Sequence, residues 1–272
     1  MSASNLWAID AHAHFGEYLN ASSERQQAFA SGDLGQVAER ARQARTCLTF
    51  VSPLEALMPR GRAQPVQGNQ RAAALVPDVP GIRQWVVVDP LTPETFAQAE
   101  VLLQQPHCIG IKIHPEEHGY AIAAKGRELF RFAAERRSVV LAHSGDRTSL
   151  PEDFVPFADE FGQVTLILAH LGHGWDGDLT HQVRAIRQCR HGNIYTDTSS
   201  AKSLTPGLIE WAVAALGAER VLYGTDSPLY FAPMQRARID HAAISAEAKR
   251  LILRDNAIRL FHLESAIGED KR

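Results

Sequence analysis

Two histidines, His12 and His14, follow the first short apolar run of the 272-residue chain. Residues two apart in an extended chain point to the same side, so these two imidazoles can bind one metal ion together. His143 and His170 each end a later apolar run, and Asp226 ends the last one. Imidazole and carboxylate groups suit zinc or a similar divalent cation. Such a site with an open position lowers the pKa of bound water and polarises a carbonyl.

Each of these five residues has a plainer interpretation when taken alone. A histidine that ends a buried strand is more often a hydrogen-bonded core residue than a ligand. An aspartate before Ser-Pro, such as Asp226, often only caps a turn. These plainer interpretations would nevertheless have to account for five such residues at four strand ends. The set as a whole therefore favours a metal site. Lys112 and His114 close a further run and are again two residues apart.

Eight short apolar runs alternate with helical patterns and would carry these residues to one place. The runs are rich in Val, Ile and Leu without strict polar alternation, as are strands buried on both faces. The expected strands are 6–11, 46–51, 85–89, 109–114, 138–143, 164–170, 193–197 and 220–226. The expected helices are 33–45, 92–105, 125–136, 178–190, 205–216 and 245–261.

This alternation predicts a single (β/α)₈ TIM barrel domain over residues 1–272. An open doubly wound sheet is the alternative, but no glycine-rich phosphate loop follows the first strand. Active sites of barrels form at the C-terminal ends of the strands, where the residues above would meet. The segments 15–32 and 53–69 predict long loops after strands one and two, either as a lid over the site or as solvated loops.

Composition excludes several classes of protein. A hydrophobic content of 45% supports a large core and argues against global disorder. The net charge of −3 argues against broad nucleic-acid binding, and no apolar run reaches the ~20 residues of a membrane span. The three cysteines are widely spaced, and the first nine residues lack the features of a signal peptide, so we expect a cytoplasmic protein. The sequence leaves the oligomeric state open, a homodimer included.

The motifs resemble, in order and spacing, those of the amidohydrolase superfamily, in particular its amidohydrolase-related group of metal-dependent hydrolases and decarboxylases. The matching segments are 9–16, 88–90, 110–115, 141–146, 168–174 and 222–228. The resemblance implies a distorted barrel in which His12, His14, His143 and Asp226 bind one metal ion. It implies that His170 is a further ligand in a two-metal site, or otherwise assists the water or the substrate.

Lys112 bears on the number of metal ions. The resemblance implies that in two-metal members a lysine on the fourth strand is carboxylated by carbon dioxide and bridges the ions. Lys112 could instead hold a substrate carboxylate as a plain cation, or be a buried structural residue. The resemblance favours one ion, with zinc as the expected metal, and leaves two open. His114 would then contact the substrate or support a ligand.

The leading functional hypothesis is metal-dependent hydrolysis, in which zinc-activated water attacks an amide, lactone or ester carbonyl of a small organic substrate. Asp226 and His170 would transfer the protons. The alternative is non-oxidative decarboxylation of an unsaturated or aromatic carboxylic acid, and an inactive barrel that binds a metal or ligand for regulation ranks below both. Besides His114, the expected substrate contacts are His173, Arg147, Trp175 and Tyr230, with Lys202, Arg60 and Arg62 as weaker candidates.

Overall fold

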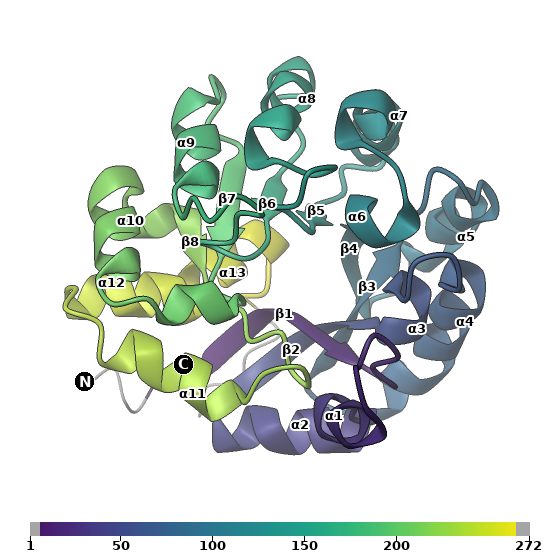
Figure 1. The fold of residues 1–272 in the computed structure, drawn as a ribbon, viewed down its shortest axis with the longest axis horizontal. Helices are drawn as coiled ribbons and strands as arrows, with labels where there is room; N and C mark the ends of the chain where they lie inside the picture. The colour runs from purple at the N-terminus through teal and green to yellow at the C-terminus, as the bar shows by residue number, and fades with distance from the viewer. Residues whose placement is uncertain (1–5, 265–272) are drawn as a thin grey trace.

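Eight parallel strands form one sheet in the order β1 to β8, and helices surround it (Figure 1). The computed structural model describes residues 6–264, and the ends of the predicted domain, 1–5 and 265–272, lie outside this range. The strands are β1 (Ala8–Phe15), β2 (Thr46–Pro53), β3 (Ile82–Val87), β4 (Cys108–Ile113), β5 (Val140–Ala142), β6 (Leu166–Leu168), β7 (Ile194–Asp197) and β8 (Val221–Leu222). The predicted (β/α)₈ TIM barrel is confirmed.

Each of the six predicted helices is present, with ends that differ by a few residues. Asp33 begins the second helix as predicted, because its side chain accepts a hydrogen bond from the Gln36 backbone and the Gln36 side chain accepts one in return. No helix within residues 6–264 is long and apolar enough to cross a membrane. The helices are α1 (Glu24–Ala30), α2 (Leu34–Gln43), α3 (Leu54–Leu57), α4 (Pro65–Leu75), α5 (Glu94–Leu102), α6 (Pro115–His118), α7 (Ile122–Glu135), α8 (Val155–Glu160), α9 (His181–Gln188), α10 (Leu208–Leu216), α11 (Ala232–Asp240), α12 (Ala246–Arg250) and α13 (Asn256–Phe261), with a π-helical turn η6 (Leu251–Asp255) between the last two.

The long segments after β1 and β2 are partly helical. The first contains α1, and the second contains α3 and the start of α4. Pro65 is the first residue of α4, a position that proline favours because it has no N–H to leave unpaired. Helices α3 and α4 pack so closely that a Cβ atom at Gly68 would lie 2.6 Å from the Cβ of Ala56.

Apolar side chains fill the barrel at the N-terminal ends of its strands. Ile9, Phe50 and Trp85 belong to one buried cluster inside the sheet. The ring of Phe261 in α13 packs edge-on against Phe50 and Trp85, with centroids 4.9 and 5.5 Å away. This helix therefore closes the interior of the barrel at that end.

An irregularity in β1 turns the two histidines inward. Ile9 and Ala11 belong to the cluster inside the barrel, whereas Ala13 packs with the helices outside. The register of β1 against β2 shifts between Asp10 and Ala13. One extra residue at such a bulge reverses which positions face inward. Even-numbered residues after the bulge therefore face the inside, and those residues include His12 and His14.

We predict that Gly68→Ala lowers the free energy of unfolding by about 1–3 kcal/mol, because the added methyl group overpacks the contact with α3. Alanine would otherwise favour the helix, so an increase in stability would contradict the close packing. Urea unfolding at equilibrium measures the change. Gln70→Ala, on the exposed side of α4, is the matched control and should leave stability nearly unchanged.

Candidate active site

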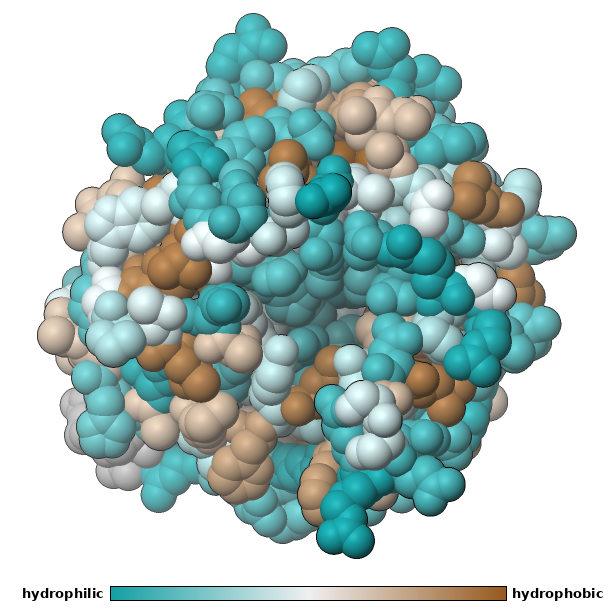
Figure 2. All heavy atoms as spheres, in the orientation of Figure 1, coloured by the Kyte–Doolittle hydropathy of each residue, from teal (hydrophilic) through white to brown (hydrophobic). Residues whose placement is uncertain are grey.

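A cavity of about 210 Å³ opens at the C-terminal ends of the strands. Figure 2 shows a hollow in the middle of this face, with hydrophilic residues along its upper side and some hydrophobic ones below it. Among the predicted metal ligands, the cavity is lined by His14, Lys112, His143, His170 and Asp226. Among the predicted substrate contacts, it is lined by His114, His173 and Tyr230. His12 lies beneath it, fully buried.

His12, His14 and Asp226 form a compact group of possible ligands. The Oδ1 atom of Asp226 is 3.0 Å from His14 Nε2 and 3.6 Å from His12 Nε2. Two ligand atoms at ~2.1 Å from one cation are about 3 to 3.5 Å apart, so these three atoms fit a single ion. The second ring nitrogen of each imidazole also has a partner. His14 Nδ1 contacts Ser52 Oγ at 2.9 Å, and His12 Nδ1 contacts Asp197. The donor set and its spacing therefore fit a divalent metal.

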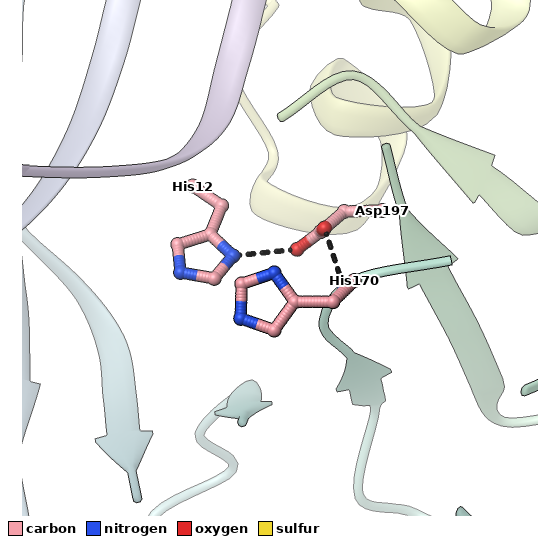
Figure 3. Close-up of side chains that lie close together, drawn as sticks. All are labelled: His12, His170 and Asp197. Atoms are coloured by element: carbon pink, nitrogen blue, oxygen red, sulfur yellow. Dashed lines mark hydrogen bonds and ion pairs between the residues drawn. The ribbon is translucent and has the colours of Figure 1, made fainter. Parts of the chain in front are cut away.

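Asp197 is a site residue that the sequence analysis missed. Its Oδ2 atom accepts a hydrogen bond from His12 Nδ1 at 2.8 Å, and its Oδ1 atom accepts one from the backbone N–H of His170 (Figure 3). The first contact fixes the His12 tautomer with the lone pair on Nε2, the atom that faces Asp226. Asp197 ends the seventh apolar run, as Asp226 ends the eighth, and this shared position was the signal that could have revealed it.

Lys112 reaches the same group from β4. Its Nζ atom is 2.9 Å from His12 Nε2, and its side chain is among the most deeply buried in the described chain. Burial lowers the pKa of Lys112 to about 8, although the carboxylates of Asp197 and Asp226 act in the opposite direction. A lysine with a lowered pKa has more of the free amine that reacts with carbon dioxide. Its roles as a cation and as a carboxylated bridge both remain predictions.

His143 lies beside this group and contacts other residues. Its Nδ1 atom is 3.1 Å from His170 Nε2, and its Nε2 atom is 2.6 Å from Asp146 Oδ2. The ring of His114 stacks on His143 at 3.9 Å, and His173 Nε2 is 3.4 Å from Asp146. The structure thus places His143 with His170 and Asp146, and its role as the fourth ligand remains a prediction.

The backbone is left-handed at two of these positions. His170 has φ +71° and lies two residues beyond the end of β6, and Asp226 has φ +57° and lies four residues beyond the end of β8. Such φ values are uncommon for residues other than glycine and cluster at functional sites. At both positions the turn follows the strand end and places the side chain in the wall of the cavity.

Two predicted substrate contacts lie away from the cavity wall. The guanidinium of Arg147 packs over the ring of Trp175 at 4.1 Å, and neither residue belongs to the described lining. Their assignment as substrate contacts remains a prediction. Arg60 forms an ion pair with Glu116, which does line the cavity. Sequence reasoning missed the acidic lining residues Glu116 and Glu117 because they are ordinary helix residues in the sequence.

Comparisons with known proteins identify the same family that the motifs resemble. A sequence model of the amidohydrolase family matches residues 9–263. No curated protein sequence matches the chain.

Solved structures share the fold at low sequence identity. A 2,6-dihydroxybenzoate decarboxylase from Rhizobium matches with a TM-score of 0.74 at 13% identity, covering 96% of this chain and 100% of that one. A 5-carboxyvanillate decarboxylase from Novosphingobium aromaticivorans, complexed with manganese and a nitrobenzoic acid, matches with a TM-score of 0.73 at 14% identity over 96% and 97%. A protein from Staphylococcus aureus described as a putative amidohydrolase matches with a TM-score of 0.70 at 14% identity over 95% and 100%.

We predict that Asp197→Asn weakens binding of Mn²⁺ or Zn²⁺ by about ten- to hundredfold, because an amide cannot hold the His12 tautomer as a carboxylate does. Isothermal titration of metal-free protein measures the affinity directly. Asp78→Asn, at an exposed carboxylate outside this cavity, is the control and should bind metal as the unchanged protein does. Equal affinities in the two variants would show that Asp197 does not position the ligand.

We also predict about one divalent ion per chain, held by His12, His14 and Asp226. Two other described groups have atoms close enough to share an ion: one reuses His12, with His170 and Asp197, and the other is the partly exposed set His143, Asp146 and His173. Elemental analysis by mass spectrometry gives the stoichiometry. Two ions per chain, together with a carbamate carbon signal after growth with ¹³C-bicarbonate, would instead show that Lys112 is carboxylated.

Proposed function

Because the chain belongs to the amidohydrolase family, we propose that it is a metal-dependent decarboxylase of a small aromatic or unsaturated carboxylic acid. The observation that supports this most is the position of His12, His14 and Asp226, whose ligand atoms meet at the base of a cavity that His170 and Lys112 also reach. A cavity of about 210 Å³ has room for one ring, since an apolar cavity of roughly 150 Å³ can hold benzene.

This proposal reverses the order of the two hypotheses drawn from the sequence. The sequence analysis ranked hydrolysis first and decarboxylation second. Two of the solved structures described above are named decarboxylases, and both act on hydroxylated benzoic acids according to their names. At 13 to 14% identity, these two structures support ranking decarboxylation above hydrolysis. They do not assign a role to any residue of this chain.

The proposed cation would be held by His12, His14 and Asp226. It would supply a positive charge that binds and polarises substrate oxygen atoms. Two imidazoles and a carboxylate accommodate zinc, which the sequence favours, and also manganese, which the N. aromaticivorans decarboxylase contains. The metal analysis predicted above decides between them.

Decarboxylation requires a proton at the carbon that bears the carboxylate. The electron pair of the breaking C–C bond then returns to the substrate π-system as carbon dioxide leaves. Burial and the neighbouring His143 hold the pKa of His170 well below its usual value, so its ring is neutral at pH 7. In this proposal His170 would deliver the proton to that carbon and take another from His143. With a pKa of about 8, Lys112 is mostly protonated at pH 7, and its ammonium group would hold the substrate carboxylate.

His143 and Asp146 connect His170 to the edge of the cavity. His170 Nε2 and His143 Nδ1 can form a hydrogen bond only if one of the two nitrogens carries a proton. The contact between His143 Nε2 and Asp146 likewise requires a proton on one of its two atoms. The Asp146 side chain is 26% exposed, whereas His12 is fully buried. A proton can therefore pass between solvent and His170 along these three groups without crossing the ligand group.

Hydrolysis is the second candidate, supported by the carboxylate of Asp226 next to two imidazoles. Burial acts to raise the pKa of Asp226, but hydrogen bonding and charge from His14 lower it below the ordinary value, so it is ionised at neutral pH. An ionised carboxylate at this position can accept a proton from an attacking water molecule. The same cavity could then accept an amide, lactone or ester in place of an acid.

We predict that the manganese- or zinc-loaded protein releases carbon dioxide, which hydrates to bicarbonate, from 2,6-dihydroxybenzoate or a related hydroxybenzoate. Asp226→Asn and His170→Asn should each reduce the rate at least about a hundredfold, because each removes a proton-transfer or ligand group. Coupled bicarbonate assays and chromatography of the products measure this. Hydrolysis of lactones or esters without bicarbonate release from any acid would favour the second candidate, and undiminished activity in both variants would contradict the assigned site.

A further inference from the structure

We propose that the cavity selects substrates with a single carboxylate and an uncharged or positively charged opposite end, and that it rejects dicarboxylates. This inference deepens the proposed function and rests on it. It follows from the distribution of charge between the base of the cavity and its rim.

Carboxylates outnumber cations around the cavity. Glu116, Glu117, Asp146 and Asp226 all belong to its lining, and Lys112 is the one lysine or arginine among the lining residues described. Lys112 lies at the base, next to His12, and a metal ion would add positive charge at the same place. A substrate carboxylate therefore finds positive charge at the base, whereas the Arg60 guanidinium is already paired with Glu116.

Neutral groups hold the Glu117 carboxylate in place. Its Oε1 atom accepts a hydrogen bond from the Asn20 side chain at 3.0 Å, and its Oε2 atom accepts one from the Arg60 backbone N–H at 2.7 Å. Both donors are neutral, so they orient the carboxylate without cancelling its charge. The Arg60 side chain pairs with Glu116, and no ion pair reaches Glu117 within residues 6–264.

Two tyrosines complete the wall between base and rim. Tyr18 and Tyr230 both line the cavity. Burial, followed by the charges of Glu117 and Asp226, raises the pKa of Tyr18, and burial with Asp226 raises the pKa of Tyr230 to about 12. Both phenols therefore keep their protons at neutral pH and can donate hydrogen bonds to substrate oxygens. These neutral donors suit hydroxyl substituents, and they offer no positive charge to a second carboxylate.

The expected size of the discrimination follows from Coulomb's law. A unit charge on the ligand about 6 Å from a protein carboxylate changes the dissociation constant roughly three- to hundredfold, for effective dielectric constants between about 80 and 20. The rim is partly open to solvent, so we expect a value near the middle of this range, about tenfold between a neutral and a negatively charged end.

Three benzoates that differ at one position test this inference by binding alone. They are 3-(aminomethyl)benzoate, 3-(hydroxymethyl)benzoate and isophthalate, with positive, neutral and negative opposite ends at pH 7.5. Isothermal titration against the metal-loaded protein should show isophthalate about tenfold weaker than the hydroxymethyl compound, and the aminomethyl compound at least as tight. Glu117→Gln keeps the shape of the side chain and should reduce the difference to about threefold or less.

Glu128→Gln, on the exposed side of α7, is the matched control and should leave the order and spacing of affinities unchanged. The inference is overturned if isophthalate binds as tightly as the neutral compound, if Glu117→Gln leaves the discrimination intact, or if none of the three compounds binds at millimolar concentration. The bicarbonate assay on hydroxybenzoates is separate, so failure of the proposed reaction is distinguishable from failure of the charge preference.

Discussion

The seam between the first and last strands is the constraint on which this structure depends. β8 has only two residues in regular pairing, so the two edges of the sheet meet through individual backbone bonds beyond it. The carbonyl of His12 accepts hydrogen bonds from the N–H groups of Thr225 and Asp226 at 3.1 and 2.8 Å. Asp10 binds Thr225 through both its carboxylate oxygens. The same residues close the barrel and bring His12 and His14 to Asp226.

The sequence predicted the barrel and the location of the site because both depend on local patterns. The position of His143, His170 and Asp226 at the ends of apolar runs was sufficient to place them at one end of a parallel barrel. The inward rotation of His12 and His14 depends on a register shift against β2, and no local pattern encodes that shift. The contacts of His143 with Asp146, and of Glu116 with Arg60, depend on how separate loops pack, which residue types alone do not determine.

Burial of the charged ligand group costs folding free energy. Lys112, Asp197 and Asp226 are removed from water together with the His12 ring, and each depends on the others for compensation. Loss of one partner from such a set leaves an unpaired buried charge, which is more destabilising than an ordinary surface substitution. The apolar plug at the opposite end, with Phe261 against Phe50 and Trp85, keeps this polar region confined to one end of the barrel.

The distance along the chain between the joined residues links the site to the order of synthesis. His14 and Asp226 are 212 residues apart, and Asp10 and Thr225 are 215 apart. More than four-fifths of the chain must therefore be synthesised before the three ligands can come together. Contacts of such high sequence separation form late, because the entropy of closing the chain must be overcome first. Capture of a cation by all three ligands would accordingly mark a completed barrel, and partly synthesised chains would offer the metal only the His-x-His pair.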